Sequence, residues 1–274
     1  MSGGILDVQG TLILKKNLDN QTSSSTDLGT GVIELSGTTP QTISGQNTIG
    51  KLRINNAAGV VIAGNTKVND SLKIINGLVT LGSYNLLLGP SALCSTGSSS
   101  AMVVAEGTGE LRKEFSTTPS FPLNFTYPVG DNTGTAEYTP VTVNFTSGTF
   151  GTGNYLGVNL KNLPDPDPGL ASGNYLSRYW TLDSNAISGT VSCGVTFNFT
   201  DADVTGTKTS LFCVKSSPVL ETFNGVSGNQ LTGTVSGFSR FTGADAALQA
   251  SLKVFLQGPY NTTDDHMTDS LTAK

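Results

Sequence analysis

The chain has 274 residues, a formal net charge of −5 at pH 7 and 13 % charged residues, about half the usual ~25 %. This composition excludes a charge-rich disordered tail and a helix bundle, and its few scattered Lys and Arg residues argue against nucleic-acid binding. A single histidine, His266, nearly excludes histidine metal clusters and Ser-His-Asp triads.

The chain also lacks targeting and membrane-spanning signals. No apolar run approaches the ~20 residues that a transmembrane helix needs. Residues 1–10 lack the charged and apolar regions of a signal peptide. We therefore expect either a cytosolic protein or an internal piece of a longer one, and the uncapped end at 267–274 favours the second interpretation.

An internal repeat dominates the first hundred residues. Residues 51–64 align with residues 71–82, and similar short apolar runs begin earlier at 32–35 and 11–14. The period of roughly 18–21 residues holds two or three short strands separated by Gly, Asn or Ser, with no helical segment. This spacing predicts a parallel β-solenoid over residues 1–95. An antiparallel sandwich of the same strands would explain the alternation of apolar residues but not the period.

The alignment of the two clearest copies predicts which side chains face inward. The inward positions are Leu52, Ile54, Leu72 and Ile74. Between them, Arg53 and Lys73 face solvent. Asn56 and Asn76 should stack at a corner, where side-chain amides can hydrogen-bond along the axis.

A different pattern follows a Ser-rich joint at residues 91–100. Aromatic residues become frequent, apolar residues alternate cleanly in 139–148 and 191–200, and turn signals recur every ten or so residues. These features predict an antiparallel β-sandwich over residues 96–247, with Trp180 as a core anchor.

Two segments are expected to lie outside this core. The run LPDPDPG at 163–169 should form an exposed loop, because proline has no amide hydrogen to donate to a sheet. Residues 248–274 are expected to be a linker or the start of a following module, with LKVFLQG at 252–258 as its first strand.

The three cysteines leave two interpretations open. Cys193 and Cys213 share strand parity with apolar neighbours, so both are candidates for the core. They are either two small buried residues or a cross-strand disulfide. Cys94 makes the count odd, which is poor support for a disulfide framework.

Several strings together carry a family resemblance. They are GTGELRKEF (107–115), FTYPVGDNTGTAEYTPVTVNFTSGTF (125–150), YLSRYWTL (175–182), FNFTDADVTGT (197–207), GFSRFTGAD (237–245) and LKVFLQGPYN (252–261). The chain resembles the modular, repeat-containing surface and secreted proteins of the Bacteroidetes type, adhesin-like proteins associated with type IX secretion. The resemblance covers essentially the whole chain. It implies an extracellular or cell-surface location and a role as a stalk, spacer or adhesive segment.

Calcium is the only cofactor that the sequence suggests. Asp201 and Asp203 alternate before Gly206, as in an acidic calcium loop, but the later bidentate glutamate is missing. Asp165 and Asp167 form a second pair in a proline-stiffened loop. A third pair, at 264–265, is a weaker candidate. No metal ligand or cofactor-binding residue is assigned.

Catalytic arrangements find little support. No nucleophile elbow is present, so a hydrolase triad is not expected. A solenoid polysaccharide lyase would need clustered acids beside a base. Arg53 and Lys73 could supply the base, but Glu34 is the only glutamate near them. Charge on this face also argues against ice binding, so we expect a solvated face and assign no catalytic residue.

The sequence therefore predicts a non-enzymatic structural or adhesive segment of a large exported surface protein. Its partners would be surface glycans or neighbouring modules of the same chain. The alternative is a carbohydrate-binding module of a secreted polysaccharide-degrading protein, with exposed Tyr84, Tyr155, Tyr175 and Tyr179 stacking on sugar rings. A β-helical polysaccharide lyase is the third hypothesis.

Overall fold

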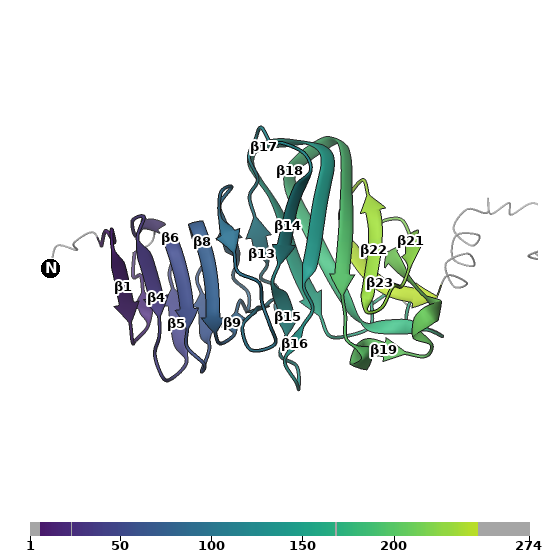
Figure 1. Ribbon diagram of the computed structural model, residues 1–274, viewed down its shortest axis with the longest axis horizontal. Helices are drawn as coiled ribbons and strands as arrows, with labels where there is room; N and C mark the ends of the chain where they lie inside the picture. The colour runs from purple at the N-terminus through teal and green to yellow at the C-terminus, as the bar shows by residue number, and fades with distance from the viewer. Residues whose placement is uncertain (1–5, 23, 168, 246–274) are drawn as a thin grey trace, which may run out of the picture.

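The protein is an elongated, nearly all-β molecule. The computed structural model describes residues 6–22, 24–167 and 169–245. Strand β1 lies at one end of the long axis and strands β21 to β23 lie towards the other (Figure 1). The tail at 248–274, with LKVFLQG, the acidic pair at 264–265 and His266, falls outside the described residues.

A β-solenoid of about five turns forms the N-terminal half. Its two parallel ladders run along the axis. The first ladder consists of β1 (Thr11–Leu14), β4 (Val32–Leu35), β6 (Asn47–Asn55), β8 (Thr66–Asn76), β10 (Leu86–Leu88) and β13 (Leu111–Lys113). The second consists of β2 (Leu18–Asp19), β5 (Gln41–Ser44), β7 (Val60–Ala63), β9 (Val79–Thr80), β12 (Val103–Val104) and β15 (Val129–Asp131). The short strands β3 (Thr26–Asp27) and β11 (Leu93–Cys94) pair with β6 and β8.

The register of the first ladder confirms the repeat alignment. Glu34 pairs with Arg53, and Arg53 pairs with Lys73 in the next turn. The predicted inward residues of these turns, Leu52, Ile54, Leu72 and Ile74, are at most 5 % exposed. Because strand side chains alternate between faces, each turn adds its apolar residues to one column. Each buried Leu or Ile contributes about 1.5–3 kcal/mol relative to an exposed one.

Polar side chains bind neighbouring turns together at one corner. Asn65 Oδ1 accepts a hydrogen bond from the backbone amide of Asn85 at 2.9 Å, and Asn85 Oδ1 accepts one from the amide of Glu110 at 2.9 Å. The predicted stack of Asn56 on Asn76 is wrong. A register shift places Asn76 opposite Asn55, and the side-chain amide of Asn56 donates to Thr39 and Gln41 instead.

The parallel ladders continue beyond residue 95, where the sequence repeat ends. Strand β13 pairs with β10 in parallel, and β12 pairs in parallel with both β9 and β15. The Ser-rich joint at 91–100 therefore lies within the solenoid. These last strands have only two or three residues each, too few to show the repeat in the sequence.

The remaining strands are antiparallel and continue the solenoid's sheets. They are β14 (Leu123–Tyr127), β16 (Glu137–Tyr138), β17 (Val141–Lys161), β18 (Tyr175–Asn198), β19 (Val204–Thr205), β20 (Leu211–Lys215), β21 (Glu221–Gly225), β22 (Gln230–Val235) and β23 (Arg240–Asp245), with 3₁₀ turns η1 (Asp201–Asp203) and η2 (Lys208–Ser210). Strand β17 pairs with β13, and β16 pairs with β15. The predicted antiparallel pairing is present. A sandwich separate from the solenoid is not confirmed, because the β13–β17 pairing joins both regions into one sheet.

One hydrophobic core runs through both regions. Its buried side chains extend from Val8 in the first turn to Phe241 in β23. Trp180 is fully buried and packs on Phe197 with ring centroids 5.0 Å apart, so its predicted role as a core anchor is confirmed. Because one core continues through both regions, no break in the packing separates the solenoid from the antiparallel strands.

The cysteines are all free thiols. Cys193 and Cys213 are fully buried, which fits the first of the two interpretations and leaves no disulfide between them. Burial raises the pKa of both thiols to about 12, so they stay protonated and weakly reactive at neutral pH.

The close stacking of turns leaves no room for a side chain at Gly64. A Cβ added at Gly64 would overlap the backbone carbonyl of Gly45 in the preceding turn. We expect Gly64→Ala to lower the free energy of unfolding by about 1–3 kcal/mol, measured by urea denaturation. Gly237→Ala is the matched control, since no atom lies within 4 Å of a Cβ there. Equal stability of the two variants would contradict this packing of the turns.

Candidate functional site

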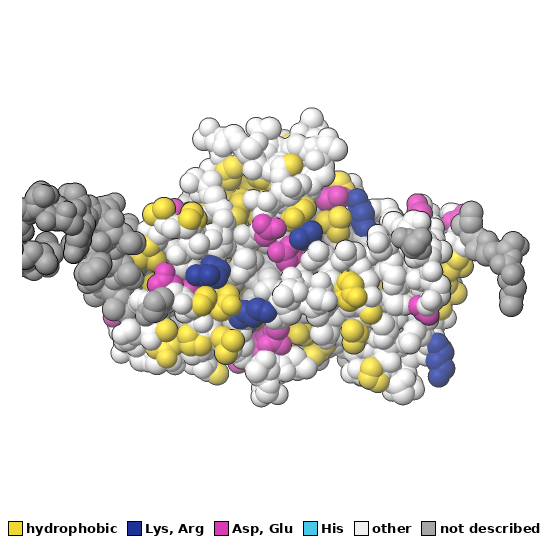
Figure 2. All heavy atoms as spheres, turned by 180° about the vertical axis from the view of Figure 1, so that it is seen from behind, with side chains coloured by type: hydrophobic (Ala, Val, Ile, Leu, Met, Phe, Trp, Pro, Cys, Tyr) yellow, Lys and Arg dark blue, Asp and Glu magenta, His cyan; other side chains and the backbone are white. Residues whose placement is uncertain are grey.

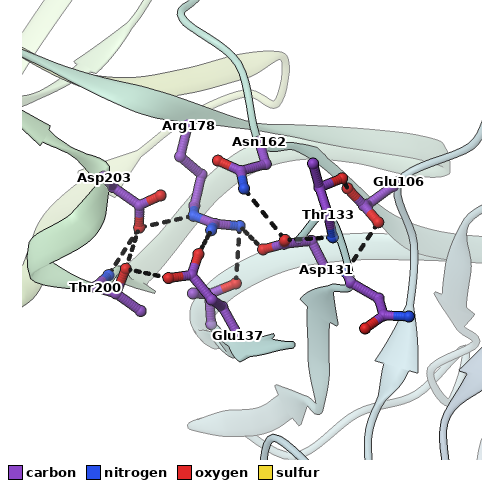
Figure 3. Close-up of polar contacts among 10 residues, drawn as sticks. Glu106, Asp131, Thr133, Glu137, Asn162, Arg178, Thr200 and Asp203 are labelled. Carbon is purple, nitrogen blue, oxygen red and sulfur yellow. Dashed lines mark hydrogen bonds and ion pairs between the residues drawn. The ribbon is translucent and has the colours of Figure 1, made fainter. Parts of the chain in front are cut away.

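A buried arginine forms the centre of the largest charged cluster described (Figure 3). Arg178 in β18 is fully buried. Its guanidinium lies 2.6 Å from Asp131, 2.5 Å from Glu137 and 2.9 Å from Asp203. These carboxylates come from β15, β16 and η1. One side chain of the antiparallel region therefore meets the last turn of the solenoid.

The cluster resolves a charge conflict in the β15–β16 pair. Asp131 and Glu137 are directly opposite each other in the ladder, an arrangement that destabilises a sheet when both carry negative charge. Arg178 lies between them and supplies the compensating charge. Burial acts to lower the pKa of Arg178, but the hydrogen bonds and charges of Asp203 and Asp131 outweigh it, so the pKa is raised above its ordinary value.

Hydrogen bonds extend the cluster into the neighbouring loops. Asp131 accepts from the Thr133 amide at 3.2 Å and from the Asn162 side chain at 3.3 Å. Glu137 accepts from the Thr200 hydroxyl at 2.8 Å. Because Arg178 is fully buried and engages three carboxylates, the cluster fixes the junction between the two regions and presents no open position to a ligand.

The aspartates considered for calcium contact protein cations. Asp203 belongs to the buried cluster, and Asp201 lies 2.7 Å from Lys208, whose hydrogen bond lowers the pKa of that carboxyl. Asp165 is a buried residue of the proline-rich loop that was expected to be exposed, and it lies 3.2 Å from Arg240. Within the described ranges, no three His, Cys, Asp or Glu residues group as metal ligands. The sequence suggested Asp165 and Asp203 as calcium ligands; in the structure the partner of each is a guanidinium.

A second buried cation lies inside the last turn. Lys113 is 5 % exposed, and its Nζ donates to the carbonyls of Gly89 at 2.5 Å and Pro90 at 2.8 Å. It also lies 5.5 Å from the ring centre of Phe125. Burial lowers the pKa of Lys113 to about 8.

The candidate ligand site is an open groove of about 380 Å³ on the outer face of the first ladder. It crosses the strands from β6 to β17. Its lining combines the apolar Leu87 and the ring of Tyr155 with neutral polar and charged side chains. The lining residues able to contact a bound ligand include Asn65, Lys67, Asn85, Leu87, Arg112 and Tyr155.

The charges in the groove are already neutralised. Lys67 lies 2.7 Å from Glu114, and Arg112 lies 2.7 Å from Glu110. The Arg112 guanidinium also lies 4.2 Å from the ring centre of Tyr155. Burial raises the pKa of Tyr155, so its hydroxyl stays protonated and donates to Asp183 at 3.2 Å. The groove is therefore a polar, nearly neutral surface with one fixed aromatic ring.

The four tyrosines chosen from the sequence are not brought together. Tyr84 is 40 % exposed and the other three are partly exposed. Tyr155 lines the groove, while Tyr179 lies beside Arg240, 6.0 Å from guanidinium to ring centre. The asparagines at the groove, Asn65 and Asn85, were missed. The turn-to-turn alignment of asparagine-containing corners was the signal that could have found them.

Comparison of the chain with models of known protein families, with curated proteins and with solved structures finds no match. Among the residues described, no helix has the length and apolar character to cross a membrane.

Removing the guanidinium tests the role of the buried cluster. Arg178→Met leaves three carboxylates without their cation, and we expect the free energy of unfolding to fall by about 3–5 kcal/mol, measured in urea at neutral pH. Arg53→Met, which removes a partly exposed pair with Glu34, is the control and should cost at most about 1 kcal/mol. Similar small losses in both variants would show that the cluster does not hold the junction.

Lys113 should leave a signature in the pH dependence of stability. Its pKa is about 8 in the folded protein and 10.5 ordinarily, so between these values the unfolded chain binds more protons. Stability from this site therefore rises as pH increases from about 8 towards 10.5. We expect the free energy of unfolding of wild type to rise relative to that of Lys113→Met as the pH increases across this range.

The exposed Lys73 provides the control for that measurement. The Lys73→Met variant lacks an exposed lysine and keeps the buried one. The cysteines and tyrosines titrate in wild type and in both variants, so their contribution cancels when the stability of either variant is subtracted from that of wild type. A flat difference for Lys113→Met would contradict the burial of a partly neutral lysine.

Proposed function

We propose that this chain is a non-enzymatic spacer and adhesive segment of an exported cell-surface protein. The single observation that supports this best is the continuous sheet and core that join the solenoid to the antiparallel region. A spacer must hold its two ends apart, and the described ends of this chain lie towards opposite ends of its long axis (Figure 1). The resemblance to adhesin-like surface proteins supports the location.

The surface fits the same role. Figure 2 shows a long face that is mostly neutral, with the charged side chains of its middle part close to partners of opposite sign. Paired charges and abundant Ser, Thr and Asn favour short-range hydrogen bonding over electrostatic attraction at a distance. Such a surface suits contact with glycans or with neighbouring modules.

We also propose that the antiparallel strands pack as the two layers of the expected sandwich. One layer would contain β14, β22 and the halves of β17 and β18 that pair with them. The other would contain β23, β20, β21 and the remaining halves. Contacts between Trp180 and Phe197, and between Phe197 and Phe241, both with centroids 5.0 Å apart, support this packing because they join the two groups.

A carbohydrate-binding module remains the second candidate function. The observation that favours it is the groove beside Tyr155, whose lining places apolar groups beside hydrogen-bonding side chains. This role is compatible with a spacer, because the groove lies on the outer face of the solenoid.

Small-angle X-ray scattering of the full chain tests the spacer. We expect the profile of one rigid, elongated particle that is the same at low and high salt, because the surface charges are few and paired. Arg178→Met should broaden the distance distribution if the protein still folds, since the junction is then loosened. A wild-type profile that requires a hinge between the solenoid and the antiparallel region would contradict the proposal.

A further inference from the structure

We propose that the groove beside Tyr155 binds a neutral, linear polysaccharide that lies along the solenoid axis. This inference deepens the adhesive part of the proposed function by naming a ligand class and the residues that would recognise it. A sugar chain presents apolar ring faces and neutral hydroxyl groups. The groove offers the apolar Leu87 and the ring of Tyr155 beside the side-chain amides of Asn65 and Asn85, which match both.

Two side-chain donors at the groove are held in a fixed orientation. The side-chain oxygens of Asn65 and Asn85 each accept a backbone amide hydrogen from the next turn. This fixes which side of each side chain carries the NH₂ group. Neither Nδ2 donates to another group in the part of the chain that the structure describes. Both donors are therefore held in place before a ligand arrives, which lowers the entropic cost of binding.

The spacing of these two donors matches the repeat of a sugar chain. Asn65 and Asn85 occupy equivalent corners of successive turns, and neighbouring strands lie about 4.8 Å apart. That separation is similar to the length of one sugar unit in an extended polysaccharide. A chain running across the strands would meet a donor at each of the two turns, and then reach Tyr155 at the far side of the groove.

The ring of Tyr155 and the paired charges beside it also suit a neutral sugar chain. Arg112 covers one side of the Tyr155 ring, and the hydroxyl is held by Asp183, so the ring cannot turn freely. A fixed ring is suited to stack on a sugar. Lys67 and Arg112 are each paired with a glutamate, which removes the excess positive charge that an anionic polysaccharide would need. The groove therefore favours a neutral ligand.

Affinity electrophoresis in native gels tests this inference. Gels would contain xylan, glucomannan, mixed-linkage β-glucan or dextran as neutral probes, and alginate as the anionic probe. Wild type should be retarded by at least one neutral polysaccharide. Tyr155→Ala and the double variant Asn65→Asp, Asn85→Asp should each weaken retardation about tenfold, as loss of roughly 1.4 kcal/mol implies.

The variants are chosen to separate binding from folding. Asparagine to aspartate keeps the oxygen that accepts the backbone amide and replaces the NH₂ donor with a charged acceptor oxygen. The added charge changes mobility in any gel, so the retardation of each variant is taken relative to the same variant in a gel without polysaccharide. Tyr155→Phe keeps the ring and should retain binding, and Tyr84→Ala removes an exposed tyrosine outside the groove and should bind as wild type.

The remaining outcomes overturn the inference. They are no retardation by any neutral probe, retardation by alginate alone, or retardation that the groove variants leave unchanged. In each case an unaltered scattering profile would leave the spacer proposal intact, so failure of the two proposals can be told apart.

Discussion

The open end of a solenoid is the constraint on which this structure depends. Each parallel ladder ends in a strand whose backbone groups need partners, and the core beneath it needs a cover. Here β17 pairs with β13 on one sheet and β16 pairs with β15 on the other, both antiparallel. The antiparallel region is thus the cap of the solenoid as well as its continuation.

Capping in this way creates the charge problem that Arg178 solves. The β15–β16 pair sets Asp131 opposite Glu137, and η1 adds Asp203 on the same side. A buried guanidinium contacts all three carboxylates and offsets part of their negative charge. Strand β18 carries it to this position at the last turn of the solenoid. The cluster makes the fit of cap to solenoid specific, because a slip of one residue in β18 would move Arg178 to the other face of the sheet.

The rigid junction and the groove are linked through the same strands. Strand β17 supplies the pairing that closes the first ladder and also carries Tyr155 to the groove. A binding surface built across several turns and the cap requires that they do not move relative to each other. The proposed spacer role and the proposed recognition of a polysaccharide therefore depend on one structural property.

The periodic part of the fold was predictable and the junction was not. The register from Glu34 through Arg53 to Lys73 follows from a repeat that is visible in the sequence of the first turns. Strands β12 and β13 were missed as parts of the solenoid because they are too short to repeat visibly. Arg178 shares strand parity with Leu176 and Trp180, so a charge at an inward position did signal a buried ion pair.

Its partners could not be found from the sequence in the same way. Asp131 and Glu137 lie more than 40 residues away along the chain, and only the antiparallel closure of β15 by β16 brings them together. The groove was missed for a similar reason. Its asparagines and Tyr155 come from strands separated by about 70 residues or more, which the cap sets side by side.

Differential scanning calorimetry of the full chain tests the central claim most directly. If the solenoid and its cap share one core and one sheet, they unfold together, and the calorimetric enthalpy should equal the van't Hoff enthalpy of a single transition. Two resolved transitions, one for the solenoid and one for the antiparallel region, would contradict the account.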